Sequence, residues 1–336
     1  MLITKIYKPS EFNEAAKELR LGELVAFPTE TVYGLGADAT NEQAVKRVYL
    51  AKGRPSDNPL IVTVSSLEMV KRFVPSLSKE VEKIIEKFWP GSLTIVLKIK
   101  DGSLSKTVTG GLKTAAFRMP KNETTLNLIT ALGNPIVGPS ANSSGKPSPT
   151  TAQHVYHDLE GRIAGILDDG PTDVGVESTI IDMSTEIPTI LRPGAVTAEE
   201  IEKVIGKEQY SDKHKVKENE IPKAPGMKYK HYAPSAQVLI VNKDNWNSAL
   251  QWANENKNQV GILADDEVLS KALENKTYSL GENVESAAKN LFAGLRYFDD
   301  DNQIKYILAE AFPEEGVGLA YMNRLKKSAG NQFYNK

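Results

Sequence analysis

Two hydrophobic periods alternate along the first two hundred residues, one typical of helices and one typical of buried strands. A helical period over residues 11–20 is followed by an apolar run at 24–27, which predicts a helix and then a strand. The helical spacing i, i+3, i+4 and i+7 is clearest at Val81, Ile84, Ile85 and Phe88. Further apolar runs predict strands at 59–64, 92–99, 115–119, 135–137, 164–167, 178–182 and 188–191. This mixture predicts an α/β domain with a twisted, mixed sheet and flanking helices.

Side-chain caps indicate where two of the helices begin. Thr40 and Gln43 have the spacing of a capping box, and so do Thr197 and Glu200. We therefore predict helices that start at these two points, the first of them ending near Lys52.

Composition changes after residue 206. Residues 207–231 contain seven lysines, four acidic residues and few apolar ones, which is typical of a solvated linker. Residues 223–234 are instead rich in aromatic residues, proline and glycine. We therefore predict a linker over residues 207–235, whose last part forms a lid or tether.

A second α/β pattern begins at residue 236. Strands are predicted at 236–241, 259–263, near 278 and at 304–310, and helices at 244–256, 266–274, 283–298 and 317–328. Regular alternation of strand and helix is typical of parallel sheets in three-layer domains. The sequence therefore predicts an N-terminal domain over 1–206 and a smaller, parallel-sheet domain over 236–336.

Charge and composition narrow the classes of function. The 336 residues include 41 Lys and Arg against 43 Asp and Glu, so the net charge is −2. A protein held on a polyanion by its overall charge usually has a clear basic excess, so any nucleotide or nucleic acid must meet a local cluster of positive charge. The absence of cysteine excludes disulfides and thiolate nucleophiles and fits a reducing compartment. No stretch approaches about 18 uninterrupted apolar residues. We expect a cytoplasmic protein without membrane contact.

Standard nucleotide, zinc and nucleophile motifs are missing. Gly34 and Gly36 lack the third glycine of a dinucleotide-binding fingerprint, and six residues separate Gly138 from Gly145 where a Walker loop has four. The pair His154 and His157 shares a predicted helix face without a third ligand nearby, so we expect surface histidines and no structural zinc. No Ser-His-Asp order offers a covalent nucleophile. Any chemistry must therefore run by positioning and charge stabilisation.

Four basic residues stand in three separate segments of the N-terminal half. Lys52 and Arg54 lie at the end of a predicted helix, before a proline-stiffened loop. Arg118 lies in one apolar run that predicts a strand, and Arg192 ends another. Lysine as a compact charge and arginine as a bidentate fork suit phosphate oxygens. If the fold brings the four together, they form the local positive site that a nearly neutral chain needs.

Small polar residues are concentrated in two loops of the same half. The segment FPTETVYGLG (27–36) follows a strand directly, and a polar turn at the carboxyl end of a strand is where open α/β sheets commonly bind ligands. An ordinary strand-to-helix loop is the alternative interpretation. The segment GPSANSSGKPSPT (138–150) supplies many small donors that suit close approach to an anion.

These motifs resemble the signature of the YrdC-like threonylcarbamoyl-AMP synthases. The matching residues are Phe27–Gly34, Lys52-x-Arg54, Trp89–Gly91, Arg118-x-Pro120, Ser140-x-Asn142, Ser178–Thr179 and Arg192–Gly194. Residues 225–234 look like the linker of the longer, two-domain members. The resemblance covers almost the whole chain. It implies a YrdC-like N-terminal domain with a twisted mixed sheet and a smaller, Rossmann-like C-terminal domain.

The resemblance also implies an activity. Members of this family condense L-threonine, bicarbonate and ATP to threonylcarbamoyl adenylate and pyrophosphate, the first step in forming threonylcarbamoyladenosine in tRNA. Magnesium would arrive on the ATP phosphates without a dedicated protein site. A separate transferase would take the product to tRNA, so direct tRNA binding by this chain would be weak or unneeded.

Residue by residue, the resemblance implies two sets of contacts. The ATP set is Lys52, Arg54, Asn58, Thr114, Ser140, Asn142, Ser148, Arg192 and Tyr232. The threonine set is Thr31, Thr63, Arg118, Gly138 through its backbone, and Ser178. Thr63 departs from the family pattern, because some members have a histidine there with a longer reach.

Two other functions compete with the synthase. The basic residues could contact RNA phosphates in a non-enzymatic RNA-binding module, although the sequence contains no standard RNA-binding motif. The same fold could also serve a hydrolase or transferase that acts on a carbamoyl adenylate made elsewhere. Pyrophosphate release that depends on ATP separates the synthase from both. The sequence does not assign a role to the C-terminal domain or fix the oligomeric state.

Overall fold

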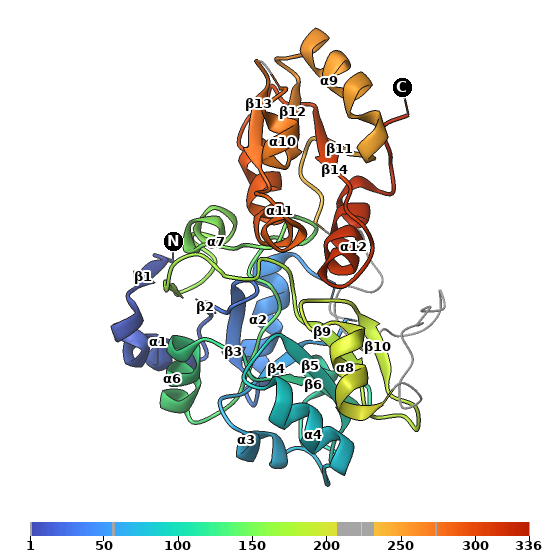
Figure 1. The fold of residues 1–336 in the computed structure, drawn as a ribbon. Helices are drawn as coiled ribbons and strands as arrows, with labels where there is room; N and C mark the ends of the chain where they lie inside the picture. The colour runs from blue at the N-terminus through green and yellow to red at the C-terminus, as the bar shows by residue number, and fades with distance from the viewer. Residues whose placement is uncertain (1, 56–57, 207–222, 224–231, 273, 336) are drawn as a thin grey trace.

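Two β-sheets organise the chain, whose computed structural model describes residues 2–55, 58–206, 223, 232–272 and 274–335 (Figure 1). The strands of the N-terminal part are β1 (Lys5–Tyr7), β2 (Val25–Phe27), β3 (Gly34–Asp38), β4 (Ile61–Thr63), β5 (Leu93–Lys98), β6 (Thr114–Arg118), β7 (Ile136–Val137), β8 (Gly165–Leu167), β9 (Thr179–Asp182) and β10 (Thr189–Arg192). They form one sheet in the order β1-β8-β2-β3-β7-β4-β6-β5-β9-β10. Parallel pairs such as β4–β6 lie beside antiparallel pairs such as β5–β6, so the predicted mixed sheet is confirmed.

Short helices cover this sheet and connect its strands. They are α1 (Phe12–Arg20), α2 (Glu42–Lys52), α3 (Leu67–Lys71), α4 (Lys79–Phe88), α5 (Lys106–Thr109), α6 (Glu123–Leu132), α7 (Ala152–Leu159) and α8 (Ala198–Ile205), with a 3-10 turn at Pro9–Glu11. The helical spacing noted in the sequence lies on α4, where Val81, Ile84 and Ile85 are buried. The amphipathic period therefore packs its apolar face against the core, as predicted.

The first residues of the helices test the predicted caps. Thr197 and Glu200 form a capping box at the start of α8, which confirms that prediction. The prediction for α2 was wrong by one residue, because the cap is Asn41. Its side chain accepts hydrogen bonds from the backbone N–H groups of Gln43 and Ala44, whereas the Thr40 hydroxyl donates to Asp38. Both residue types cap helices well, so composition alone did not separate two neighbours.

The segment at 27–36 joins two strands, which corrects the strand-to-helix alternative. β2 pairs antiparallel with β3, a strand that the sequence did not predict. All five residues of β3 are buried, and a Cβ on Gly34 would lie 2.4 Å from the ring of Phe27. Glycine is therefore required where the aromatic side chain crosses the neighbouring strand. The edge strand β1 was also missed.

The second sheet contains β11 (Gln237–Val241), β12 (Val260–Ala264), β13 (Lys276–Ser279) and β14 (Tyr306–Glu310) in the order β11-β14-β12-β13. Every pair in it is parallel, so the parallel α/β prediction for this half is confirmed. Its helices are α9 (Trp246–Glu255), α10 (Asp266–Leu269), α11 (Val284–Asp299) and α12 (Val317–Ala329), with a 3-10 turn at Lys243–Asn245. α10 is much shorter than the predicted helix over 266–274.

Helices α11 and α12 lie on the side of this smaller sheet that faces the N-terminal part (Figure 1). Their core reaches across the chain and includes Val32, Val176 and Tyr232. The smaller sheet therefore shares a hydrophobic core with loops of the larger one.

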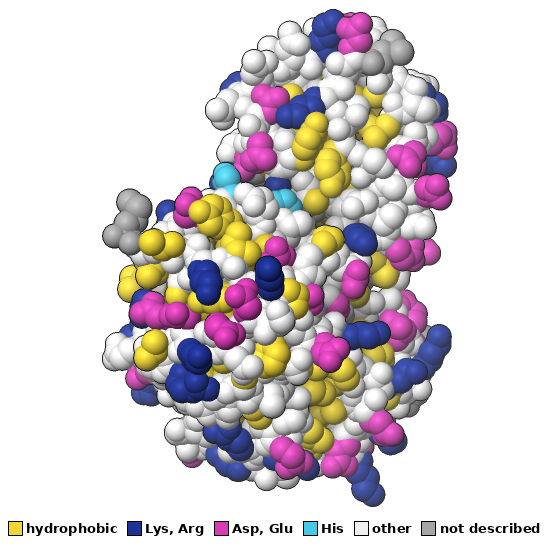
Figure 2. Space-filling model, turned by 90° about the vertical axis from the view of Figure 1, so that its left-hand side faces the viewer, with side chains coloured by type: hydrophobic (Ala, Val, Ile, Leu, Met, Phe, Trp, Pro, Cys, Tyr) yellow, Lys and Arg dark blue, Asp and Glu magenta, His cyan; other side chains and the backbone are white. Residues whose placement is uncertain are grey.

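Charged side chains of both signs are interspersed over the face shown in Figure 2. This face carries no extended basic surface of the kind that a polyanion would contact. Among the described residues, no helix is long and apolar enough to span a membrane.

Candidate active site

A cavity of about 340 Å³ collects most of the residues that the sequence singled out. Its wall comes from the end of α2, the 138–146 loop, the residues just before β9, the end of β10 and Tyr232. Ten of the fourteen predicted substrate contacts line it: Lys52, Arg54, Asn58, Arg118, Gly138, Ser140, Asn142, Ser178, Arg192 and Tyr232. The fold thus brings the four basic residues from their separate segments to one site.

A smaller cavity of about 20 Å³ adjoins the first. The two share Arg118, Gly138 and Ser140, and the smaller one adds Thr63. The N–H of Gly138 donates to the carbonyl of Ile61 at 2.9 Å, so its carbonyl is the backbone group that can meet a ligand. A Cβ at Gly138 would lie 2.5 Å from Oγ1 of Thr63. Glycine therefore lets the threonine hydroxyl approach the strand closely.

Three predicted contacts lie outside the walls of both cavities. Thr31 is fully buried, and its hydroxyl accepts a hydrogen bond from Arg118 at 2.8 Å. Ser148 is also fully buried and donates its hydroxyl to Glu177 at 2.6 Å. Thr114 begins β6, at the opposite end of the strand from Arg118. Thr31 and Ser148 therefore support groups of the cavity wall, whereas Thr114 stands apart from it.

Arg118 is held rigidly at the junction of the two cavities. Its Nη1 donates to Thr31, its Nε donates to the Gly91 carbonyl at 3.3 Å, and its Nη2 lies 2.8 Å from Oε1 of Glu30. Nη2 is buried and makes no hydrogen bond within the described part of the chain. The ion pair with Glu30 offsets part of the cost of burying this nitrogen, and the guanidinium is fixed where both cavities can reach it.

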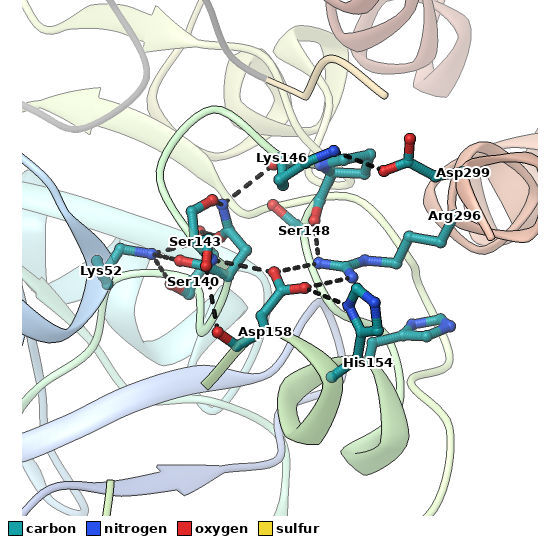
Figure 3. Close-up of polar contacts among 12 residues, drawn as sticks. Lys52, Ser140, Ser143, Lys146, Ser148, His154, Asp158, Arg296 and Asp299 are labelled. Atoms are coloured by element: carbon teal, nitrogen blue, oxygen red, sulfur yellow. Dashed lines mark hydrogen bonds and ion pairs between the residues drawn. The ribbon is translucent and has the colours of Figure 1, made fainter. Parts of the chain in front are cut away.

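Lys52 and the 138–146 loop are joined by short contacts (Figure 3). The ammonium of Lys52 donates to the carbonyls of Ser140 and Asn142 and lies 3.4 Å from the Asn142 side-chain oxygen. Burial and the nearby charge of Arg54 lower the pKa of Lys52 well below its ordinary value. Lys52 therefore fixes the shape of the serine loop through its hydrogen bonds.

Arg192 and Glu177 form the opposite wall. Arg192 donates through Nε and Nη2 to the carbonyl of Ser178, at 3.1 and 2.9 Å. Burial and the charge of Arg324 lower the pKa of Arg192 to about 10, which leaves it charged at neutral pH. Glu177 was not among the predicted site residues, although an acid directly before a predicted buried strand was a visible signal. Its partner, Arg324, lies in α12. Burial alone would raise the pKa of Glu177, but the charges of Arg324 and Arg192 outweigh it and lower that pKa to about 2.

Tyr232 closes one side of the cavity from the start of the C-terminal half. Its ring lies 5.1 Å from that of Phe292 in α11, and its φ of 65° is in the left-handed region. Burial and the carboxylate of Glu177 raise the pKa of Tyr232 to about 12. The hydroxyl is therefore neutral at the cavity. The rest of the predicted linker, 207–222 and 224–231, lies outside the described residues.

Basic side chains outnumber acidic ones in the lining of the cavity, although Arg118 and Lys146 are ion-paired with Glu30 and Asp299. The lining carries one carboxylate, Glu177, and five basic side chains: Lys52, Arg54, Arg118, Lys146 and Arg192. Oδ1 of Asn58 is buried in the same wall and makes no hydrogen bond to any described residue. The site therefore has the charge and the polar groups to hold an anion such as a nucleotide phosphate.

The two histidines on α7 differ in exposure. His157 is exposed and lies 3.0 Å from Asp158, as a surface histidine would. His154 is partly buried against Thr150, which corrects its assignment to the surface, and burial with the charge of Arg296 lowers its pKa to about 4. The described residues contain no group of three or more His, Cys, Asp or Glu side chains that could hold a metal ion.

Comparison with known proteins assigns both halves of the chain. Residues 17–194 match the family described as telomere recombination (Sua5/YciO/YrdC), and residues 196–330 match the threonylcarbamoyl-AMP synthase C-terminal domain. The threonylcarbamoyl-AMP synthase of Bacillus subtilis is 48% identical over 95% of this chain and 93% of its own length. The Pyrococcus abyssi protein of the same name is 46% identical over 94% and 93%.

Solved structures agree with the sequence comparison. The crystal structure of P. abyssi Sua5 complexed with L-threonine superposes with a TM-score of 0.91 at 44% identity and covers 98% of both chains. Escherichia coli YciO, at 19% identity and a TM-score of 0.54, shares the fold over 60% of this chain. The chain therefore belongs to the two-domain threonylcarbamoyl-AMP synthases, and its activity is the synthesis of threonylcarbamoyl-AMP, the first step toward threonylcarbamoyladenosine in tRNA.

Proposed function

We propose that the two adjoining cavities bind MgATP and L-threonine and join them through bicarbonate, with release of pyrophosphate. The observation that carries this proposal is the placement of Arg118 at the junction of the two cavities, where Thr31, the Gly91 carbonyl and Glu30 hold its guanidinium in place. A guanidinium held in this way suits the carboxylate of an amino acid. P. abyssi Sua5, of the same fold, has been crystallised with L-threonine.

The threonine side of the site is the smaller cavity. Its carboxylate would meet Arg118, and its amine would face the carbonyl of Gly138, while Ser178 and Thr63 enclose the side chain. Thr31 would act through Arg118, to which it is hydrogen-bonded. One methyl group is worth only about 1–3 kcal/mol in such a pocket, so preference over serine would be modest.

The nucleotide side is the larger cavity. Lys52, Arg54 and Arg192 would surround the phosphates, with Ser140 and Asn142 supplying donors from the loop and Tyr232 covering the nucleotide. Asn58 would turn its buried oxygen toward the nucleotide. The single carboxylate of the wall is already paired with Arg324, so magnesium would arrive on the ATP phosphates as part of the substrate.

The reaction needs no covalent enzyme intermediate. The threonine amine attacks the carbon of bicarbonate, and loss of water gives a carbamate. A carbamate oxygen then attacks the α-phosphorus of ATP, and pyrophosphate leaves in line. Negative charge develops on the phosphoryl oxygens, which cations and hydrogen-bond donors stabilise. One cation at about 4 Å from a phosphate charge contributes about 4 kcal/mol at an effective dielectric of about 20, before desolvation.

A pyrophosphate-release assay with MgATP tests the proposal. Release by the parent protein should require both L-threonine and bicarbonate, and Arg118→Met should lose the threonine-dependent release. Release without threonine, or none with all three substrates, would contradict it. We further propose that the product passes to a tRNA-modifying transferase in the cytoplasm, so this chain itself needs only weak tRNA contact.

A further inference from the structure

Two arginines of the C-terminal half reach the nucleotide loop without lining the cavity. Arg296 lies on α11 and Arg324 on α12, the two helices that face the N-terminal part (Figure 1). Their side chains are 9% and 0% exposed, respectively. Such complete burial of a guanidinium requires partners for its charge and its donors.

Arg296 is bound to the base of the loop (Figure 3). Its two terminal nitrogens lie 3.1 and 2.9 Å from the two carboxylate oxygens of Asp158, and Nη2 also donates to the Pro147 carbonyl at 2.6 Å. Asp158 in turn accepts the N–H of Ser143 at 3.0 Å. A single guanidinium therefore ties together both ends of the 143–148 loop.

Arg324 holds Ser148, the next residue of the loop after Pro147, through the carboxylate of Glu177. Its Nε donates to Oε2 of Glu177 at 2.9 Å, and the other oxygen of Glu177 accepts the hydroxyl of Ser148 at 2.6 Å. Arg324 also donates to the carbonyl of Pro193, beside Arg192, at 2.7 Å. The guanidinium therefore fixes the serine loop and the Arg192 wall relative to each other.

A third contact between the C-terminal half and the loop is made by Lys146, the residue before Pro147. Lys146, which lines the cavity, forms an ion pair with Asp299 of α11 at 2.8 Å. Three consecutive loop residues, 146, 147 and 148, are thus held directly or through Glu177 by side chains of the C-terminal half. The loop has no helix or strand of its own to fix its shape.

We propose that Arg296 and Arg324 are positioning residues, through which the C-terminal domain sets the nucleotide-binding shape of the 143–148 loop. The proposal rests on the proposed binding of ATP at this loop. A preformed loop spares the ordering cost on binding and keeps the reacting groups in line. Loss of either arginine should therefore weaken ATP binding and slow turnover, although neither side chain touches the cavity.

Steady-state kinetics of the full-length chain, followed by pyrophosphate release, test the proposal. Arg296→Met should raise KM for ATP tenfold or more, while KM for threonine changes less than threefold. Arg296→Lys keeps the charge but not the two-pronged guanidinium, and its KM for ATP should lie between those of the parent protein and Arg296→Met. The matched control is Lys326→Met on α12, because the ammonium of Lys326 pairs with Glu314 of the same half. It should leave both KM values within twofold.

A double variant separates positioning from simple stability. Arg296→Met leaves Asp158 buried without its cation and should lower the melting temperature. Asp158→Asn combined with Arg296→Met removes both charges and should recover much of that temperature, yet KM for ATP should remain high because the contact to Pro147 is still missing. Recovery of both quantities together would mean that Arg296 only holds the domains together, and would overturn the proposal. This comparison also decides the question if the single methionine variants fold poorly.

The proposed function and this inference fail in different ways. Ser140→Ala and Arg54→Met alter the loop and wall directly. If both leave KM for ATP unchanged, ATP does not bind here and the proposed site is wrong. If they raise it tenfold while Arg296→Met, Arg324→Met and Arg324→Lys, folded as judged by melting temperature, stay within twofold, the positioning role alone is refuted.

Discussion

Gly175 offers the sharpest test of how closely the two halves must pack. It lies in the loop before β9 with a φ of 77°, and a Cβ built on it would lie 2.3 Å from the backbone oxygen of Lys289 in α11. The same Cβ would lie 2.4 Å from the Cα of Lys289. Backbone cannot rotate away as a side chain can, so Gly175→Ala must push α11 from the loop.

The expected cost has two parts. An L-residue in the left-handed region costs about 1–2 kcal/mol. Overpacking against a rigid neighbour adds about 1–3 kcal/mol. Gly170 provides the control, because its φ is 79° and its Cβ would meet nothing within 4 Å. Gly170→Ala should therefore show the first cost alone, and the difference between the two variants isolates the contact with α11.

Urea unfolding and ATP kinetics give the two readouts. Trp246 and Trp252 report on the C-terminal half by fluorescence, and Trp89 reports on the N-terminal half. Gly175→Ala should be less stable than Gly170→Ala by about 1–3 kcal/mol. It should also have a higher KM for ATP, because Arg296 lies on the displaced helix. Equal stability and equal KM in the two variants would refute the argument that α11 must stay in contact with this loop.

Three further predictions concern single side chains. Arg118→Lys should raise KM for threonine about 10- to 100-fold, since a charge-assisted hydrogen bond contributes about 1.5–3 kcal/mol, and a smaller effect on threonine than on ATP in the same release assay would contradict the assignment. Tyr232→Ala should raise KM for ATP, because the ring that covers the cavity and stacks on Phe292 is lost; unchanged ATP kinetics would exclude the lid role. Burial raises the pKa of Glu310 to about 7, above its ordinary 4.5. The contribution of neutral Glu310 to the free energy of unfolding is therefore fully present below about pH 4.5 and is lost as the pH rises through 7. Glu310→Gln should remove this loss, and its melting temperature should exceed that of the parent increasingly from pH 5 to 8; a constant difference would contradict the shift.

Local signals in the sequence predicted most of the helices and the parallel C-terminal sheet. Periodicity and caps act within a few residues, so they identified α4 and the start of α8 directly. β3 was not predicted from the sequence because Gly34 and Gly36 have little intrinsic preference for strands. Its strand conformation depends on pairing with β2 and β7, and on the ring of Phe27 filling the space that side chains would need.

The sequence likewise predicted some features of the cavity and not others. The basic residues were visible because Arg118, for example, is conspicuous in an apolar strand. Ser148 belongs to a conspicuous loop, yet its hydroxyl is turned to Glu177, which only the folded chain shows. A motif thus predicted which segments meet, but not which of their side chains face the ligand.

The buried ion pairs join residues that no local pattern connects. Glu177 and Arg324 are 147 positions apart, and Asp158 and Arg296 are 138 apart. On α12, Arg324 occupies an ordinary helical position, and its sequence neighbours Lys326 and Lys327 are also basic. What distinguishes it is the cost of burying an unpaired guanidinium, which only a matching carboxylate on the other half can offset. The pairing therefore makes correct docking of the two halves a condition for burying either charge. For that reason, loss of domain docking should also release the nucleotide loop, because the contacts of Arg296 and Arg324 with it exist only in the docked arrangement.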